Sequence, residues 1–460
     1  MNLPEDTIAA LATQPGEAGV AIVRVSGPGA FSVADRVFRC AGAPPSARPA
    51  GTFVYGHTVD AEGGRLDEAL LLVFRAPRSY TRDDVVEIHG HGGRIAATRL
   101  LRAVLSAGAR LAEPGEFTKR AFLSGRLDLV QAEAVLDLIR SQSDRAAAAA
   151  LQQLEGSLSL QFDKIYNDLM QAAARIEATL DFPEDELPET IVPEIEIELL
   201  FVRDDMNNLL NTWGEGRLLR DGARVVISGK PNVGKSTLLN ALLEANRAIV
   251  SPIPGTTRDT IEEDLVLGDI PIRLVDTAGL RETECEIEAE GIKRTRDAVA
   301  TADLHIYLAD LSVPPDEDVL RHIAGLPENR SLLIFNKTDL PHAWPPVPLH
   351  IPADRVLHVS ILQPADVRHV RHAVIQALTC GIDLSARPHA TISERHRQVL
   401  ADALVELDSG IDYLASHRED VMVLAASQVR LALQRIGEAT GKVYHEQLLE
   451  SIFSTFCIGK

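Results

Sequence analysis

Short apolar segments separated by turn-forming residues characterise the first 120 residues. Residues 20–26 and 69–75 are apolar runs bounded by glycine or proline, and residues 84–89 alternate between apolar and polar side chains. Such runs are typical of strands that bury one or both faces. The pattern predicts a small α+β domain over residues 1–120.

A helical pattern follows this region. From Arg126 to about residue 180, apolar residues recur at helical spacing, with an alanine run at 146–150 and no proline before Pro183. This favours a long-helix hairpin. Residues 184–200 hold seven acidic residues and no basic one, so we expect an exposed connection there and another helix near 194–212. After about residue 382 the pattern is helical again to the end.

Between the two helical regions the chain alternates apolar strands, glycine-rich turns and helical stretches. The strand candidates are residues 224–228, 272–275, 304–310 and 331–335. Near-continuous apolar strands alternating with helices predict a parallel sheet covered on both faces. We therefore expect an α/β domain at 216–382, inserted in a helical domain formed by 121–215 and 383–460 and preceded by the domain at 1–120.

Composition sets limits on location and partners. The 460 residues are 45% hydrophobic and 24% charged, with no apolar run long enough to span a bilayer and no N-terminal signal pattern, so we expect a cytoplasmic protein. The four cysteines (Cys40, Cys285, Cys380, Cys457) are scattered and are expected to be reduced thiols. A net charge of −20 means that an RNA partner would need a local basic surface. Residues 82–126, with eight basic against five acidic residues, indicate where such a surface would lie.

The segment Gly229–Ser236 (GKPNVGKS) matches the phosphate-binding pattern G-x-x-x-x-G-K-S. It follows the strand at 224–228 and opens a helix at 237–243. The two glycines allow backbone N–H groups to surround phosphates, Lys235 can reach the β- and γ-phosphates, and Ser236 offers a hydroxyl to Mg²⁺. A glycine-rich strand–helix turn without a ligand is the alternative.

Later segments make that alternative weak. Asp276–Gly279 (DTAG) ends an apolar strand, where the carboxylate can hold Mg²⁺ through water. Asn336–Asp339 (NKTD) ends another strand, and Asp339 can accept the N1–H and 2-amino protons that distinguish guanine from adenine. Ser360 begins the last base-supporting loop, although the next residue is Ile361 where a small alanine is usual. We predict a P-loop (Ras-like) G domain that hydrolyses GTP.

The predicted switch and catalytic elements lie between these motifs. Thr257, in Gly255–Asp259, is the candidate switch threonine that binds Mg²⁺, and a simple polar loop is its alternative. Leu280 stands where Ras-like GTPases have a water-orienting glutamine, so catalysis must be arranged differently. The predicted GTP-binding residues are Asn232, Val233, Gly234, Lys235, Ser236, Thr237, Ser251, Pro252, Ile253, Pro254, Gly255, Thr256, Thr257, Asp276, Thr277, Ala278, Gly279, Asn336, Lys337, Thr338 and Asp339.

Several segments outside the nucleotide motifs point to one family. They are Gly16–Ser26, His89–Gly93 (HGHGG), Pro114–Phe117 (PGEF), Arg126–Ala134 (RLDLVQAEA) and the ending Phe456–Lys460 (FCIGK). With them, the chain resembles the MnmE (TrmE) family of tRNA-modification GTPases essentially from end to end.

For the G domain, the resemblance implies a K⁺-stimulated, Mg²⁺-dependent GTPase whose G domains dimerise across the nucleotide. K⁺ would take the place of an arginine finger, which fits Leu280, with ligands from Asn232, Ser251, Ile253 and Thr256. Oxygen ligands suit such a hard cation. The resemblance makes Glu288 the acid that orients the attacking water, with Lys235 as the phosphate-binding catalytic lysine. Because residues 282–290 contain five glutamates, a solvated acidic loop is the alternative for Glu288.

For the N-terminal domain, the resemblance implies a folate-binding-like fold that also dimerises and holds a tetrahydrofolate derivative (5-formyl- or methylene-). The implied contacts are Arg24, Glu87, Arg126 and Lys460, and Arg126 departs from the usual lysine. Without the resemblance, Arg24 and Glu87 would equally suit an ordinary ion pair at strand ends.

Three further side chains near these segments have open roles. The resemblance makes Cys457 a catalytic or site-organising thiol, whereas a lone cysteine is otherwise a small buried hydrophobe. His89 and His91 could be metal ligands, but a close pair without a Cys or carboxylate partner more often packs or lines a turn.

Together these expectations describe a homodimer that works with tRNA and an FAD-dependent MnmG-type partner in a heterotetramer, with FAD bound in the partner. It would add an aminomethyl or carboxymethylaminomethyl group to C5 of the tRNA wobble uridine. One rival is a ribosome-assembly-type GTPase switch without modification chemistry, and another treats the N-terminal domain as a purely structural dimerisation module.

Overall fold

The computed structural model describes residues 5–181, 190–244, 262–276, 299–346, 348–379, 391–416 and 419–460. The chain forms two compact units. The first comprises Met1–Leu136, Gln153–Asn207 and Gln398–Lys460, and the second comprises Asp137–Gln152 and Asn208–Arg397. Within these units the structure confirms the predicted multidomain class: an α+β N-terminal domain, a helical domain and an α/β domain. The boundaries drawn from the sequence stay predictions.

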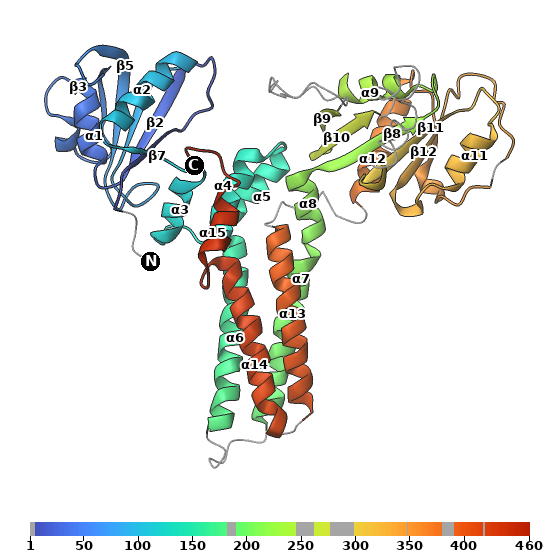
Figure 1. Ribbon diagram of the computed structural model, residues 1–460. Helices are drawn as coiled ribbons and strands as arrows, with labels where there is room; N and C mark the ends of the chain where they lie inside the picture. The colour runs from blue at the N-terminus through green and yellow to red at the C-terminus, as the bar shows by residue number, and fades with distance from the viewer. Residues whose placement is uncertain are drawn as a thin grey trace, which may run out of the picture. The chain divides into compact units, whose positions relative to one another are not determined.

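The N-terminal domain is built on a seven-stranded sheet in the order β3-β4-β5-β6-β2-β1-β7, in which β1 and β7 form a parallel pair and the other neighbours are antiparallel. Helices α1 and α2 cover one face (Figure 1), where Val23, Val25 and Ile88 meet Leu100 and Val104. Alternate residues of the same strands point to the other face. The bounds are β1 Ile8–Leu11, β2 Val20–Ser26, α1 Ala30–Val37, β3 Phe38–Cys40, β4 Phe53–Val59, β5 Arg65–Phe74, β6 Val85–His91, α2 Arg94–Ser106 and β7 Arg110–Leu111.

Long helices form the rest of the first unit. Helices α6 and α14 lie side by side (Figure 1), with Phe162 and Leu169 buried on α6 and Val429 and Ile436 buried on α14. The predicted helical hairpin is instead three helices, α4 to α6: residues 141–143 separate α4 from α5, and the turn at Gly156, with a φ of +95°, separates α5 from α6. The bounds are α3 Glu116–Leu123, α4 Leu129–Arg140, α6 Ser157–Asp181, α7 Ile191–Asn211, α13 Glu394–Ala415, α14 Glu419–Thr440 and α15 Glu446–Phe453; α5, Asp144–Leu154, belongs almost entirely to the second unit.

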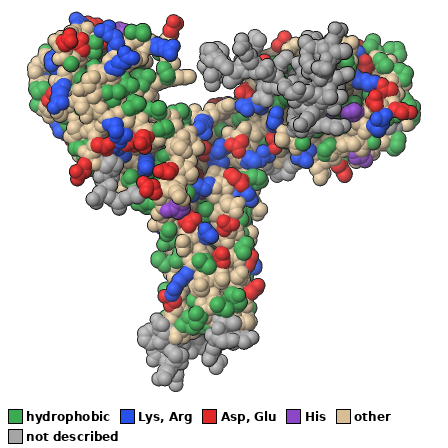
Figure 2. Space-filling view, in the orientation of Figure 1, with side chains coloured by type: hydrophobic (Ala, Val, Ile, Leu, Met, Phe, Trp, Pro, Cys, Tyr) green, Lys and Arg blue, Asp and Glu red, His purple; other side chains and the backbone are tan. Residues whose placement is uncertain are grey.

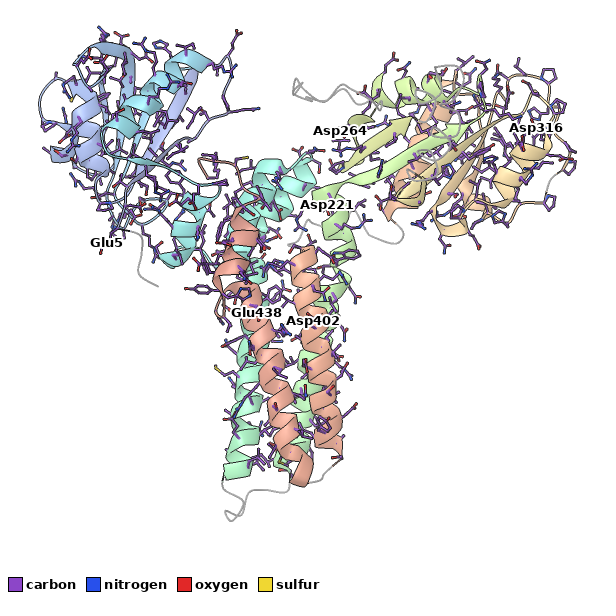
Figure 3. The ribbon with its side chains drawn as sticks, in the orientation of Figure 1. Glu5, Asp221, Asp264, Asp316, Asp402 and Glu438 are labelled. Carbon is purple, nitrogen blue, oxygen red and sulfur yellow. The ribbon has the colours of Figure 1, made fainter. Side chains whose placement is uncertain are left out.

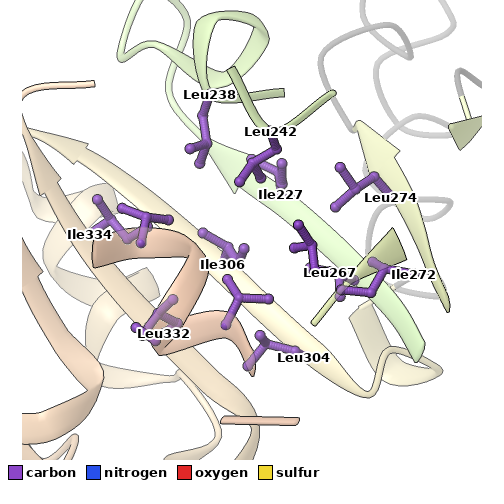
Figure 4. Close-up of a cluster of buried hydrophobic side chains, with 14 of the residues drawn as sticks. Ile227, Leu238, Leu242, Leu267, Ile272, Leu274, Leu304, Ile306, Leu332 and Ile334 are labelled. Carbon is purple, nitrogen blue, oxygen red and sulfur yellow. The ribbon is translucent and has the colours of Figure 1, made fainter. Parts of the chain in front are cut away.

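The second unit contains a six-stranded sheet in the order β13-β12-β11-β8-β10-β9, parallel except for the edge strand β9. The predicted strands are confirmed as β8, β10, β11 and β12. Figure 4 shows their apolar core, where Ile227, Ile306 and Ile334 meet Leu238 and Leu242. The bounds are α8 Trp213–Asp221, β8 Ala223–Gly229, α9 Lys235–Glu244, β9 Glu262–Leu267, β10 Ile270–Asp276, β11 Leu304–Asp310, α11 Glu317–Ala324, β12 Ser331–Asn336, β13 Val356–His358 and α12 Pro364–Thr379.

The position of strand β8 in this sheet bears on function. Strand β8 is central, and its neighbours on both sides come later in the chain. Open α/β sheets bind ligands at the carboxyl ends of such strands. Asp316 caps α11 near this edge by accepting a hydrogen bond from Val319 N at 3.0 Å (Figure 3).

In the part of the chain that the structure describes, no helix is both long and apolar enough to cross a bilayer.

Candidate functional site

The turn between β8 and α9 has the backbone of a phosphate cradle. Gly229 and Gly234 have φ of +144° and +109°, and Asn232 between them has φ of +64°. A Cβ on Gly229 would lie 2.3 Å from the Leu308 carbonyl oxygen, and one on Gly234 would lie 2.5 Å from Asn336 Nδ2. Glycine is therefore required at both positions for steric as well as conformational reasons. The tight turn leaves backbone N–H groups available for phosphate oxygens.

Lys235 spans this turn. Its side chain is buried, and Nζ donates to the carbonyl oxygens of Gly229 at 3.0 Å and Lys230 at 2.7 Å. The ammonium is thereby held in the turn where the β- and γ-phosphates are expected. Ser236 and Thr237, in the first turn of α9, are exposed, so the Ser236 hydroxyl is accessible to a cation beside the phosphates.

Asn336 links the phosphate turn to the predicted guanine loops. Its side chain is 5% exposed, donates from Nδ2 to the Val233 carbonyl at 2.8 Å and accepts from Ile361 N at 3.1 Å. The Ile361 side chain packs into the core with Val233, which explains how this loop accommodates isoleucine in place of alanine. The link itself uses the Ile361 backbone, so a larger side chain does not interrupt it.

The residues after Asn336 are arranged for base recognition. Asp339 is exposed, and its carboxylate has no partner among the described residues, so both oxygens are available to guanine. Lys337, with φ of +67°, pairs through Nζ with Asp310 Oδ2 at 2.6 Å. Burial opposes ionisation of Asp310, but hydrogen bonds from Lys337 and Ser312 lower its pKa overall. Asp310 was missed from the sequence, although it is the last residue of a buried parallel strand, at the edge where ligand-contacting residues gather.

A buried pair lies beneath the phosphate turn. Ser228 Oγ is 2.6 Å from His305 Nε2, and His305 Nδ1 has no hydrogen-bond partner in the described residues. Burial, with a smaller contribution from His322, lowers the pKa of His305 to about 4. His305 is therefore neutral at neutral pH and fixes the end of β8 directly before Gly229.

Part of the predicted site lies outside the described residues. For Asp276, the backbone is described: it ends β10 opposite Ile227 of β8, at the carboxyl edge of the sheet. The roles of the remaining residues stay predictions, and these residues are Ser251, Pro252, Ile253, Pro254, Gly255, Thr256, Thr257, Thr277, Ala278, Gly279 and Glu288.

A second polar site lies on the face of the N-terminal sheet opposite α1 and α2. Arg24 on β2 is the register partner of Glu87 on β6, and its Nε donates to Glu87 Oε1 at 2.8 Å. Glu87 Oε2 is 3.2 Å from His89 Nε2, while His91 Nδ1 is 2.7 Å from Asp67 Oδ1. Each histidine thus has its own carboxylate. Across the described ranges, no group of three such side chains is placed to hold a metal ion.

Two aromatic rings, missed from the sequence, border this site. The Arg24 guanidinium lies 5.5 Å from the Tyr80 ring centroid and 5.7 Å from that of Phe117. Arg126 lies 4.7 Å from the Tyr80 centroid and donates from Nη1 to the Tyr80 carbonyl at 2.9 Å. Tyr80 Oη is 2.9 Å from Thr118 Oγ1, and burial raises the pKa of Tyr80. Tyr80 therefore holds both guanidinium groups at the site.

The end of the chain is docked onto the same site. Gly115 N donates to the Cys457 carbonyl at 3.4 Å, and Phe117 N donates to the Lys460 carbonyl at 3.2 Å. Gly459 has a φ of +100°, and a Cβ there would lie 2.4 Å from the Leu11 carbonyl oxygen. The tail can therefore approach β1 this closely only with glycine at that position.

The docked tail brings another cation to the cluster. Burial lowers the pKa of Lys460, and the positive charge of Arg24 lowers it further, while Glu87 and Cys457 act in the opposite direction. Cys457 is exposed and contributes to the electrostatic surroundings of Lys460. All four predicted folate contacts, Arg24, Glu87, Arg126 and Lys460, thus belong to one neighbourhood, although their role stays a prediction.

A network of ion pairs anchors α3 beneath this site. Arg120, 1% exposed, donates from Nη2 to Asp6 Oδ1 at 2.7 Å and to Glu116 Oε1 at 2.9 Å. Arg110 donates to Glu116 through both Nη1 and Nη2 and also binds Asp6. Burial alone would raise the pKa of Glu116, but hydrogen bonds from Arg110 and Arg120 lower it overall. This network fixes the segment that carries Phe117 and Thr118.

Two family models match consecutive stretches of the chain. A family model described as "GTP-binding protein TrmE N-terminus" matches residues 7–126, and one described as "MnmE helical domain" matches residues 129–457. The tRNA modification GTPase MnmE of Geobacter sulfurreducens is 44% identical over 464 residues, which is 99% of each chain. The chain belongs to the MnmE family. The MnmE protein of Geobacillus kaustophilus is likewise 41% identical over 471 residues, again 99% of each chain.

Among solved structures, the chain is similar to the G domain of the T. maritima FeoB iron transporter. That chain is 22% identical, covers 34% of this chain and 98% of its own length, and gives a TM-score of 0.23. The assignment rests on the MnmE relatives, and it confirms the resemblance inferred from the sequence. As an MnmE-family member with this nucleotide cradle, the chain is a GTPase.

Proposed function

We propose that this chain couples GTP hydrolysis to modification of C5 of the tRNA wobble uridine. With an FAD-dependent MnmG-type partner it would add an aminomethyl or carboxymethylaminomethyl group. The observation that carries the proposal is the coexistence of two separate polar sites in one MnmE-family chain: the guanine-nucleotide cradle around Lys235 and Asn336, and the Arg24–Glu87 cluster. A ribosome-assembly switch would need the first site but not the second.

The charge of the N-terminal cluster suits a folate. Three cationic side chains gather at this cluster: Arg24 pairs with Glu87, Arg126 lies over the Tyr80 ring that Arg24 also contacts, and Lys460 interacts electrostatically with Arg24 and Glu87, where burial disfavours its charged form. The carboxylates of a tetrahydrofolate derivative would offset this positive excess. Each Glu87 oxygen meets one protein donor and keeps a further lone pair, so Glu87 can accept hydrogens from a pterin edge. The bound derivative would supply the one-carbon unit.

In the G domain, Lys235 and the turn amides would hold the phosphates, and Ser236 and Thr257 would ligate Mg²⁺. Asn232 is exposed, so its side-chain oxygen can serve K⁺ together with Ser251, Ile253 and Thr256. Glu288 would orient the attacking water. Homodimers would close their G domains across GTP and release them after hydrolysis, in the cytoplasm and in a heterotetramer with the partner.

Folate binding can be tested on the full-length chain. Labelled 5-formyltetrahydrofolate should bind the wild type, bind Arg24→Ala at least about tenfold more weakly because a charge-assisted contact is lost, and bind Arg65→Ala as it binds the wild type. Arg65 is a matched control because it is an arginine of the same sheet that pairs with Glu68 at 2.8 Å, away from the cluster. A wild type that does not bind the ligand would remove the folate assignment.

The K⁺ assignment has its own test. GTP turnover should be faster in K⁺ than in Na⁺, and Asn232→Ala should abolish that preference while leaving Mg²⁺-dependent nucleotide binding in place. Equal turnover by the wild type in the two salts would contradict the assignment.

A further inference from the structure

The basic excess of residues 82–126 is concentrated on one helix. Arg110 and Arg120 are neutralised by Asp6 and Glu116, as described above. Arg126 stacks on Tyr80 in the N-terminal cluster. Four arginines remain exposed and have no acidic partner among the described residues. Arg82 donates to the Ser124 carbonyl at 2.9 Å, and the other three, Arg94, Arg99 and Arg102, all belong to α2.

Helix α2 presents these arginines on its solvent side. Residues three to four apart lie on one face of a helix, so Arg94, Thr98 and Arg102 follow one another along the helix with Arg99 beside them. The opposite side, with Ala97, Leu100 and Val104, is buried against the sheet. The helix contains no acidic residue. Its outer face is therefore a row of positive charge about 12 Å long.

Helix α1 extends this face. Arg36 Nη1 donates to the Ala107 carbonyl at 2.9 Å, which places Arg36 at the C-terminal end of α2. Arg39, just beyond α1, is exposed and binds the Asp35 backbone carbonyl at 2.7 Å. The Asp35 carboxylate accepts a hydrogen bond from Ser46 N. Figure 2 shows Lys and Arg side chains on the N-terminal domain, with Asp and Glu side chains among them. We call the surface formed by Arg36, Arg39, Arg94, Arg99 and Arg102 the α1/α2 basic face.

We propose that the α1/α2 basic face binds the phosphate backbone of tRNA. The inference rests on tRNA being the substrate, as proposed above. The net charge of −20 repels a polyanion from most of this chain, so a tRNA must approach where positive charge is concentrated. Arginines suit phosphate through their planar, multiple N–H donors. A duplex carries one negative charge per about 1.7 Å of its axis, so a row of this length faces several phosphates.

The position of this face sets its role. It lies on the side of the sheet covered by helices, whereas the Arg24–Glu87 cluster lies on the other side. The basic face therefore holds the body of the tRNA and does not contact the reacting uridine. Phosphate contacts position a nucleic acid without reading its sequence, so this surface contributes affinity and orientation.

The test compares two charge-matched variants of the full-length chain. One is Arg94→Gln/Arg99→Gln/Arg102→Gln on α2. The control is Arg65→Gln/Arg321→Gln/Arg430→Gln, three exposed arginines that pair with Glu68, Asp318 and Glu177. Each changes the formal charge from −20 by three charges, to −23. The dissociation constant of an unmodified tRNA transcript is measured by fluorescence anisotropy between about 50 and about 200 mM salt.

The α2 variant should bind tRNA at least about tenfold more weakly, and its salt slope should fall by about two to three. The control should keep nearly the wild-type constant and slope, and both variants should keep wild-type GTP turnover and thermal unfolding. Binding of the α2 variant with wild-type affinity and slope would overturn the proposal, as would an equal loss in the control.

Two other outcomes would also overturn it. One is a wild type that binds no tRNA on its own; the other is a variant that loses binding to vesicles containing anionic lipid but retains tRNA binding. Failure here is distinguishable from failure of the proposed function. The α2 variant could bind tRNA normally while loss of GTP binding in cells still removes the wobble modification. In that case the proposed function would be retained and the proposed tRNA-binding surface would be rejected.

Discussion

Asn336→Ala tests how the nucleotide site is held together. The substitution removes the carboxamide that joins the Val233 carbonyl of the phosphate turn to the Ile361 amide of the last base loop. Asn336 is 5% exposed, so both groups would be left without their partner in a mostly buried place. Each such loss costs about 1–3 kcal/mol. Because solvent can reach the open edge of the site, we take the lower half of that range, about 3 kcal/mol in total.

This free energy should appear mainly in nucleotide affinity. The two hydrogen bonds hold the phosphate turn and the base loop in register, and binding to the variant has to order them again. At 1.4 kcal/mol per tenfold, the dissociation constant for GDP should rise about 100-fold. It is measured by titration of a fluorescent GDP analogue, with thermal unfolding followed in parallel. Asn329→Ala, at an exposed position of the same unit, is the control and should bind as the wild type does.

Asn336→Asp separates the hydrogen bonds from the volume of the side chain. It keeps the size and the acceptor for Ile361 N, but it places a carboxylate oxygen against the Val233 carbonyl. It should therefore bind GDP at least as poorly as Asn336→Ala. Affinities of both variants within about threefold of the wild type would refute the role assigned to Asn336.

Three further predictions follow from single residues. Burial lowers the pKa of His305 to about 4 from 6.5, so below pH 6.5 the unfolded chain binds a proton more readily than the folded protein does. The free energy of unfolding should therefore keep its full value above pH 6.5 and fall by about 3 kcal/mol towards pH 4. Urea unfolding of His305→Gln should show a flatter pH dependence. Gly459→Ala should displace the tail from Leu11 and weaken folate binding, measured by titration, without changing GTP turnover. Asp339→Asn should reduce GTP affinity at least about 100-fold and favour xanthosine triphosphate, since an amide can donate to the 2-oxygen of xanthine; unchanged base preference in competition binding would contradict this.

The parallel strands of the G domain were predictable because they are continuous apolar runs ending in polar motifs. Strand β9 was not predicted, although a signal was present: Gly268 and Asp269, with φ of +56° and +65°, form the two-residue turn of a hairpin with β10. The first helical region is divided into three helices by a break at residues 141–143 and by Gly156, and a lone glycine does not reveal from the sequence whether a helix continues or turns.

The residues of the candidate sites also differ in whether they could be predicted from the sequence. Local motifs carry their own geometry, so Lys235, Asn336 and Asp339 could be placed from the sequence alone. Tyr80 could not, because its contacts with Arg24 and Arg126 join residues far apart in the chain. The docking of the tail on α3 is likewise a long-range contact, although the family resemblance pointed to Lys460.

The central claim is that the two sites serve one process, and nucleosides from cellular tRNA test it most directly. Strains carrying either Asp339→Asn, which disables guanine recognition, or Arg24→Ala, which disables the N-terminal cluster, are compared by mass spectrometry with the parent strain and with Arg65→Ala. Both site variants should lose the C5 aminomethyl-type group from the wobble uridine, while the control keeps it. Wobble uridines that remain fully modified in the Asp339→Asn strain would contradict the account.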